Sequence, residues 1–275
     1  MVYSMADIKC MTIKKSDSWI PWEFENKRMR KSLPTDLVPA DIIDSEDDRY
    51  RSFLLTLAMI FNDLKGLVII NDSIKEAYRM PLKLEISEHV GEKEGIAVQM
   101  LKILFATLHE ALEFLNQSDD VYKSKRFQLL LQRTSSENQL VWEMLVKIAL
   151  HESTSDNRFD KYKEIQGFLV EARNNVGFHY QTHKRLIDGY RKFFIEGISN
   201  VVPEARKFAY WSIAREFSDS RYYYADASLQ GYYINLFGDE KLAQERVEEI
   251  FGLLNLVVYS IHDVLKEYHS NIPNR

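Results

Sequence analysis

Apolar side chains recur every three or four residues over most of this chain, and this spacing constrains its fold more than any other feature. Such a period places apolar groups on one face of an α-helix, and the helix buries that face against its neighbours. The clearest stripes lie within residues 53–68, 97–115, 140–148 and 247–268. We therefore predict an all-α fold, a multi-helix bundle of roughly six to eight helices.

Signals for other fold classes are weak. The apolar run at residues 66–70 also fits the end of the first long helix, and the alternation within residues 80–87 allows one short hairpin at most. None of the ten glycines lies in a phosphate-binding glycine-rich pattern, which argues against a nucleotide-binding α/β domain. The stripe at 140–148 follows Ser135 and Ser136, either of which could cap the exposed amides of a helix.

The first 45 residues show no helical period. We predict that residues 1–45 form an irregular arm and that residues 46–275 form the helical bundle domain. The arm holds three of the six prolines together with Trp19 and Trp22. Tryptophans bury a large area at a low cost in conformational entropy. We expect both to anchor the arm on the bundle, and the alternative is that they bind a protein partner.

Composition narrows the classes of function. The chain has 275 residues, of which 45% are hydrophobic, and a net charge of −5. It can bury a large core without disulfides or structural metals. The acidic balance disfavours broad, non-specific binding to nucleic acids, but a local basic site remains open. The single cysteine, Cys10, and the lack of a signal-peptide pattern or a run of roughly 20 apolar residues predict a soluble, cytoplasmic protein.

Metal-dependent and hydrolytic sites find little support. No histidine follows a glutamate by three positions, as di-iron bundles require, and neither His109-Glu110 nor His151-Glu152 continues into a zinc-binding H-E-x-x-H. His179 and His183 have the spacing of two ligands that share a metal on one helix face, but no third ligand accompanies them. No G-x-S-x-G elbow is present. We predict no metal and no cofactor.

The most unusual stretch is EARNNVGFHYQTHKRL, residues 171–186, at the end of an amphipathic helix. Arg173 and His179 fall about 60° to either side of the apolar stripe, so both border the packed seam. In one continuous helix they are about 120° apart and cannot act on one phosphate. The helix must therefore distort within the Asn-Asn-Val-Gly segment, where Gly177 is permissive, or the site must form between two subunits.

This stretch contains an arginine, a polar residue and a histidine that lies four to six positions after the arginine, all within a predicted helical bundle. The pattern resembles the signature of the HEPN superfamily. Here the residues are Arg173, Asn174 and His179. The resemblance implies metal-independent RNA cleavage, often in toxin or phage-defence settings, at a site formed where two protomers meet. Some HEPN-like domains bind RNA without cutting it. The structural alternative is that Arg173 pairs with a carboxylate in a helix seam and that His179 is a core histidine.

The residue types suit the implied chemistry. His179 could act as general base or acid towards a ribose 2′-hydroxyl, Arg173 could brace the transition state, and Asn174 could orient the phosphate or the histidine. Residues 171–192 carry a formal charge of +3, which is also what a solvated positive face would show. The predicted substrate-binding residues, for a single-stranded RNA, are Tyr180, His183, Lys184 and Arg185.

A non-catalytic helical scaffold or regulatory protein is the competing interpretation. Its partner would bind through Trp19 and Trp22 or through the tyrosine-rich region from Tyr222 to Tyr233. Tyrosine-rich helices are mostly packed surfaces or subunit interfaces, although tyrosines also stack on nucleobases, and Arg221 and Asp226 could join a polar site there. A homodimer fits both interpretations.

Overall fold

The computed structural model describes residues 49–77, 86–152, 161–174, 183–196, 211, 213 and 220–270. Within these ranges the chain is helical and forms no β-strand. The predicted all-α, multi-helix bundle is therefore confirmed. The predicted N-terminal arm, with Trp19 and Trp22, lies outside the described residues, as do His179 and Tyr180.

Each of the four predicted stripes falls within one helix. The described helices are α3 (Arg49–Ala77), α4 (Ile86–Asn116), α5 (Asp119–Tyr122), α6 (Lys125–Leu131), α7 (Ser136–Ala149), α8 (Lys161–Ala172), α9 (His183–Arg191), the π-helical turn η4 (Lys192–Glu196), α11 (Tyr223–Phe237) and α12 (Glu240–Ser270). The described residues thus hold nine α-helices, one more than the upper predicted number. The excess comes from α5 and α6, which are too short to show an apolar period.

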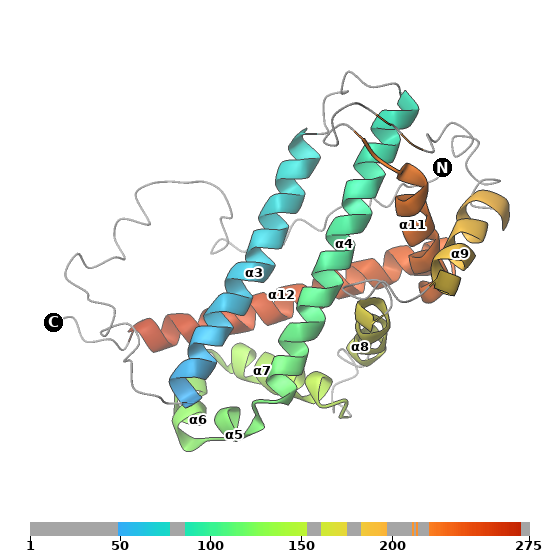
Figure 1. Cartoon of the computed structure of the whole chain (residues 1–275). Coiled ribbons are helices and arrows are strands. Elements are labelled where there is room, and N and C mark those ends of the chain that lie inside the picture. Colours follow the sequence, from blue (N-terminus) through green and yellow to red (C-terminus); the bar gives the residue numbers. More distant parts are fainter. Residues whose placement is uncertain are drawn as a thin grey trace.

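Two long helices, α4 and α12, organise the bundle. α3 and α4 run antiparallel beside each other, and α12 crosses behind them (Figure 1). α4 packs against α3, α7, α8 and α11, and α12 packs against α3, α6, α7, α8 and α11. α9 lies on the outer side of α11 (Figure 1). The ends of α7 and α8 are thereby brought beside the C-terminal half of α4.

Aromatic side chains fill much of the core. Phe53 of α3 contacts the rings of Phe114, Phe127 and Trp142, at centroid distances of 5.2, 5.4 and 6.5 Å. Burying one such side chain contributes about 1.5–3 kcal/mol. A second group joins Phe105 of α4 to α11 through Tyr233, whose ring centroid lies 5.3 Å away. Burial raises the pKa of the Tyr233 phenol above its ordinary value.

Local signals define both ends of α7. The Ser135 hydroxyl accepts a hydrogen bond from the Asn138 amide at 3.1 Å, so Ser135 is the cap that the sequence predicts. At the other end, the amides of His151 and Glu152 donate to the carbonyls of Ile148 and Lys147. This pair of bonds defines a Schellman motif with His151 in the left-handed region, at φ +56°.

Glycines allow α9 and α11 to cross at very short range. A Cβ atom added to Gly231 of α11 would lie 2.1 Å from the carbonyl oxygen of Gly189 in α9. A Cβ added to Gly189 would lie 2.1 Å from the carbonyl oxygen of Ser228. Only hydrogen fits at either position, and the crossing fixes α9 against the body of the bundle.

Among the described helices, α3 and α4 each contain a stretch, Arg49–Ile74 and Gly91–Asn116, that is long and apolar enough to cross a membrane. The sequence-based expectation that no run approaches this length needs correction on that point. The most apolar windows of these stretches are 33% and 50% buried inside the protein. Both helices supply core residues of the bundle, and core helices of soluble proteins have the same length and composition.

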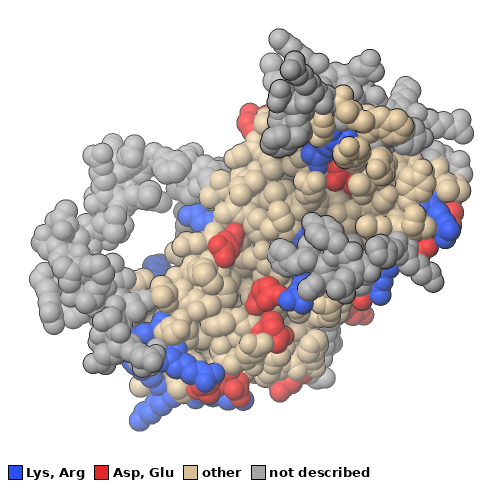
Figure 2. Space-filling model, in the orientation of Figure 1, with Lys and Arg blue, Asp and Glu red and all other residues tan. Residues whose placement is uncertain are grey.

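Basic side chains gather at the end of the molecule where α3 begins and where α5 and α6 lie (Figure 2). There Arg49 forms an ion pair with Asp120 at 2.9 Å, and the guanidinium of Arg126 lies 4.1 Å from the ring centroid of Tyr50. These contacts fasten the two short helices to α3.

Candidate functional site

Arg173 stands where the regular part of α8 ends. The predicted stripe of Tyr162, Ile165, Leu169 and Ala172 is buried, and the backbone at Arg173 and Asn174 is π-helical. Single π turns inside or at the end of α-helices are frequent at functional sites, because they change the direction in which following side chains point. The sequence predicts either a distortion within the Asn-Asn-Val-Gly segment or a site shared by two subunits, and the backbone departs from the α-helix at the first asparagine of that segment and at the preceding arginine.

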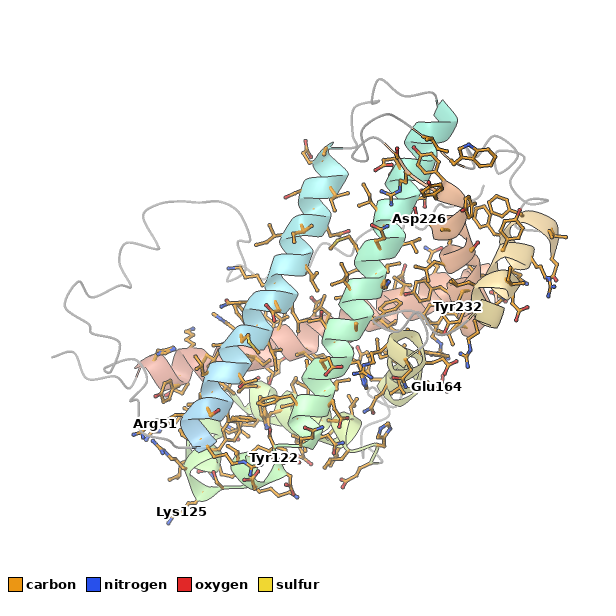
Figure 3. All side chains as sticks on the ribbon, viewed as in Figure 1. Arg51, Tyr122, Lys125, Glu164, Asp226 and Tyr232 are labelled. Carbon is orange, nitrogen blue, oxygen red and sulfur yellow. The ribbon has the colours of Figure 1, made fainter. Side chains whose placement is uncertain are left out.

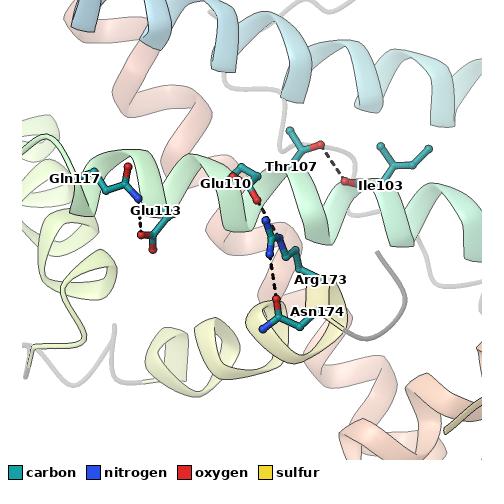
Figure 4. Close-up of polar contacts among 7 residues, drawn as sticks. All are labelled: Ile103, Thr107, Glu110, Glu113, Gln117, Arg173 and Asn174. Carbon is teal, nitrogen blue, oxygen red and sulfur yellow. Dashed lines mark hydrogen bonds and ion pairs between the residues drawn. The ribbon is translucent and has the colours of Figure 1, made fainter. Parts of the chain in front are cut away.

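The Arg173 guanidinium is held on two sides. Its Nε donates to Oε1 of Glu110 on α4 at 3.0 Å, and its Nη1 donates to Oδ1 of Asn174 at 3.1 Å (Figure 4). Nη2 makes no hydrogen bond with any of the described residues. The Arg173 side chain is 32% exposed, so it borders the seam between α8 and α4, as its helical angle predicts.

The pairing with Glu110 is also the contact expected of a structural arginine. Two features go beyond that role: one guanidinium nitrogen bonds to none of the residues that the structure describes, and Asn174 contacts the guanidinium from the next position along the chain. Glu113, one turn further along α4, is instead engaged by Gln117, whose Nε2 donates to its Oε1 at 2.8 Å (Figure 4). Glu110 is therefore the carboxylate that orients Arg173.

His109, which the sequence excludes only as part of a zinc-binding H-E-x-x-H, is the residue before Glu110. His109 of α4 is half-buried, and its Nδ1 atom is sealed from solvent without a hydrogen-bond partner. Burial lowers the pKa of His109 below its ordinary value of 6.5, and the charges of Arg173 and His151 lower it further. Glu110 and Glu113 act in the opposite direction without reversing the shift. This shift favours the neutral form of His109.

His151 approaches the same region from the end of α7. Gln166 of α8 donates from Nε2 to the Ala149 carbonyl at 3.3 Å and so joins α8 to the last turn of α7. His151 follows that turn and is close enough for its charge to lower the pKa of His109. The ends of α7 and α8 and the middle of α4 thus bring together two histidines, an arginine and a glutamate.

The structure describes only some of the predicted substrate-binding side chains. Arg185 forms an ion pair with Glu171, which links α9 to α8. His183 and Lys184 begin α9, but their side chains are outside the described set, and Tyr180 and the predicted catalytic His179 lie outside it entirely. Arg191 pairs with Asp188 at 3.4 Å. Much of the positive charge predicted for residues 171–192 is therefore paired with carboxylates.

The tyrosine-rich region is mainly part of the packed interior. Tyr223, Tyr232 and Tyr233 are buried, whereas Tyr222 and Tyr224 are exposed and contact each other with ring centroids 6.1 Å apart. The packed surface that the sequence favoured is thus observed for three of these side chains. The two exposed rings remain available to a partner.

Arg221 and Asp226 do join a polar cluster, at the upper end of α4 (Figure 3). Arg221 donates to Asp226 at 3.0 Å and to Glu92 at 2.9 Å, and all three side chains are mostly buried. A Cβ added to Gly95 would lie 2.5 Å from Oδ2 of Asp226, so the glycine makes room for the cluster. We interpret this polar cluster as a structural contact that fixes the start of α11 on α4.

Within the part of the chain that the structure describes, no group of three or more histidine, cysteine, aspartate or glutamate side chains has the arrangement of a metal site. The predicted pair of His179 and His183 is not covered by that statement, because His179 and the His183 side chain lie outside the described residues.

Comparisons with known protein families, with curated proteins and with solved structures give no match. The candidate site must therefore be judged by its own chemistry. It offers a fixed guanidinium, a neutral imidazole and a side-chain amide at the meeting point of three helices. Such donors suit the oxygens of an anion such as a phosphate.

Proposed function

We propose that this chain is a HEPN-like, metal-independent endoribonuclease of the cytoplasm that acts on single-stranded RNA. The proposal rests on the contacts and the exposure of the Arg173 side chain. Glu110 and Asn174 fix its guanidinium where the backbone turns π-helical, Nη2 bonds to none of the described residues, and about a third of the side-chain surface, 32%, is exposed. A guanidinium held in this way can receive a phosphate without a large loss of side-chain entropy.

The reaction is an internal transesterification. His179 removes the proton of a ribose 2′-hydroxyl, the 2′-oxygen forms a bond to the adjacent phosphorus, and the bond from phosphorus to the 5′-oxygen breaks. The leaving 5′-oxygen takes up a proton, and the products are a 2′,3′-cyclic phosphate and a 5′-hydroxyl. Arg173 stabilises the charge that develops on the phosphoryl oxygens, and Asn174 positions Arg173. Tyr180 stacks on a base, and His183, Lys184 and Arg185 line the RNA path.

Two protomers would build the site. Leu186 and Ile187 are exposed on α9, immediately after the predicted substrate-binding residues. Exposed aliphatic side chains beside a site that needs a second chain support a homodimer interface there. A toxin or defence role follows from the same family resemblance.

The test uses purified protein, fluorescent single-stranded RNA and an excess of EDTA, with Arg173→Ala and His179→Ala beside the wild type. Arg191→Ala is the matched control, because Arg191 is an exposed arginine whose observed partner is Asp188. We expect cleavage by the wild type and the control, and a loss of about 10²-fold or more in the two site variants. Equal background in all four proteins would rule the proposal out.

A second candidate function is a non-catalytic scaffold or regulator. It is favoured by large apolar side chains that are exposed at the start of α11 and in the chain before it: Trp211, Ile213, Tyr222 and Tyr224. This candidate predicts that Tyr222→Ser and Tyr224→Ser abolish a protein contact while RNA stays intact with every variant. Sedimentation of the wild type and the double variant separates the two functions when it is combined with the cleavage assay.

A further inference from the structure

His109 and Glu110 are consecutive residues on α4, and Glu110 contacts Arg173 at the end of α8. Glu110 bonds to Arg173, and the charges that act on His109 come from Glu110, Glu113, Arg173 and His151. These groups belong to α4, to the π turn after α8 and to the end of α7. His109 therefore belongs to the same cluster as Arg173, although 63 residues separate the arginine from Glu110.

The burial of one ring nitrogen decides how His109 can act. A neutral imidazole has one N–H donor and one acceptor nitrogen. A proton on Nδ1 would be a buried donor without a partner among the described residues, because Nδ1 is sealed and unbonded. The proton therefore resides on Nε2, the nitrogen on the accessible side of this half-buried ring. The N–H group on Nε2 can then donate to a bound ligand, since Nε2 is not one of the buried side-chain atoms without a partner.

We propose that His109 is a further phosphate-binding residue of the Arg173 site, which donates a hydrogen bond from Nε2 to a non-bridging oxygen of an RNA phosphodiester. The inference rests on the proposed ribonuclease function and deepens it. Arg173 supplies a charged donor and His109 a neutral one, so two phosphoryl oxygens can be held at once. His109 transfers no proton in the reaction, and the proton balance of the cleavage step is unchanged.

A role of His109 in proton transfer is a separate hypothesis, and it predicts a different response of the cleavage rate to substitution. As a base, His109 would need a lone pair on Nε2 and hence the disfavoured proton on Nδ1. Glutamine separates the two roles, because its side-chain amide nitrogen can donate from about the position of Nε2 but cannot exchange a proton near neutral pH. Alanine and leucine remove the donor, and leucine also fills the half-buried volume.

The experiment measures kcat and KM for cleavage of a mixed-sequence, single-stranded RNA in EDTA by the wild type, His109→Gln, His109→Ala and His109→Leu. His262→Gln is the matched control, since His262 stacks on Phe61 at 5.6 Å and the charges that act on it come from Asp263, Lys266 and Lys65 and not from the Arg173 site. Thermal unfolding of each variant shows which ones are folded at the assay temperature. An RNA with 2′-deoxy nucleotides confirms that cleavage needs the 2′-hydroxyl.

We expect His109→Gln and the control to stay within about fivefold of the wild type, and the donor-free variants to lose about 10²-fold in kcat/KM. Wild-type activity in folded His109→Ala or His109→Leu would overturn the inference and leave the proposed function intact. A glutamine variant as inactive as the alanine variant would also overturn it, in favour of proton transfer. If the wild type neither cleaves nor binds the RNA, the proposed function fails, and the inference fails with it.

Discussion

The Nε atom of Arg173 lies 3.0 Å from Oε1 of Glu110, and this contact joins the end of α8 to the middle of α4. About half of the Glu110 side chain is exposed, at 51%, so solvent screens the pair. Pairs of this kind contribute about 0–1 kcal/mol to stability. The main consequence of the contact is therefore the orientation of the guanidinium, which is the feature that the proposed reaction needs.

Replacing Glu110 should separate orientation from stability. Glu110→Gln removes the charge but keeps an acceptor oxygen, and we expect the free energy of unfolding to change by less than about 1 kcal/mol. RNA cleavage should fall by roughly tenfold, because Arg173 is held less firmly. Glu143→Gln on α7, which removes the ion pair with Lys147, serves as the control. Unchanged cleavage by Glu110→Gln would show that the pair has only a structural role.

The crossing of α9 and α11 should tolerate no side chain at its centre. Gly231→Ala would place a methyl group 2.1 Å from the Gly189 carbonyl oxygen, so the helices must separate, and we expect a loss of at least about 2 kcal/mol. Gly167 of α8 has no atom within 4 Å of an added Cβ, and Gly167→Ala should gain about 0.5–1 kcal/mol. Urea unfolding measures both changes. Equal effects at the two sites would contradict the observed crossing.

A glycine at position 151 should stabilise the end of α7. His151 occupies the left-handed position of the Schellman motif, where a side chain costs about 1 kcal/mol relative to glycine. We expect His151→Gly to raise the free energy of unfolding by about that amount. His151→Ala removes the imidazole but keeps the strained conformation, and it should give no gain. A stabilisation of the same size by alanine would attribute the effect to the lost imidazole.

Stability should fall on mild acidification. Burial lowers the pKa of His109, His262 and His269 from 6.5, so the unfolded chain binds protons more readily than the folded chain. Their contribution is complete above pH 6.5 and decreases as the pH falls towards the lower folded values. Urea unfolding at pH 7.5 and 5.5 should show this loss, by roughly 1 kcal/mol or less for each histidine.

His262→Gln should reduce the pH dependence. The charges that act on His262 are Asp263, which raises its pKa, and Lys266 and Lys65, which lower it, and burial outweighs them all. Asp119, whose pKa the Lys123 ammonium lowers from 3.8, titrates below this pH range. If the wild type is equally stable at both pH values, the histidines are not buried as neutral groups.

Local periodicity accounts for the helices that the sequence predicted well. The stripe at 97–115 predicts a helix that ends near Asn116, and α4 ends at that residue. Ser135 caps α7 because its hydroxyl can reach the Asn138 amide within the same turn. The short helices α5 and α6 could not be predicted in this way, since their buried residues, such as Val121 and Phe127, acquire their environment from α3 and α7.

The candidate site depends on contacts that periodicity cannot supply. Helical angles placed Arg173 at the edge of a packed seam, and that position is confirmed. Its partner Glu110 is 63 residues away and becomes a neighbour only when α8 packs on α4. The incomplete H-E-x-x-H spacing excludes His109 only as a zinc ligand. Its position next to Glu110 on a predicted helix is a signal that could have drawn attention to it.

The most direct test of the central claim is cleavage of single-stranded RNA in EDTA by the wild type and by Arg173→Lys. Lysine keeps the positive charge but cannot bind Glu110, Asn174 and a phosphate through one planar fork. We predict cleavage by the wild type to a 2′,3′-cyclic phosphate and a loss of about 10²-fold in the lysine variant at unchanged thermal stability. Intact RNA with the wild type, or equal cleavage by both proteins, would contradict the account.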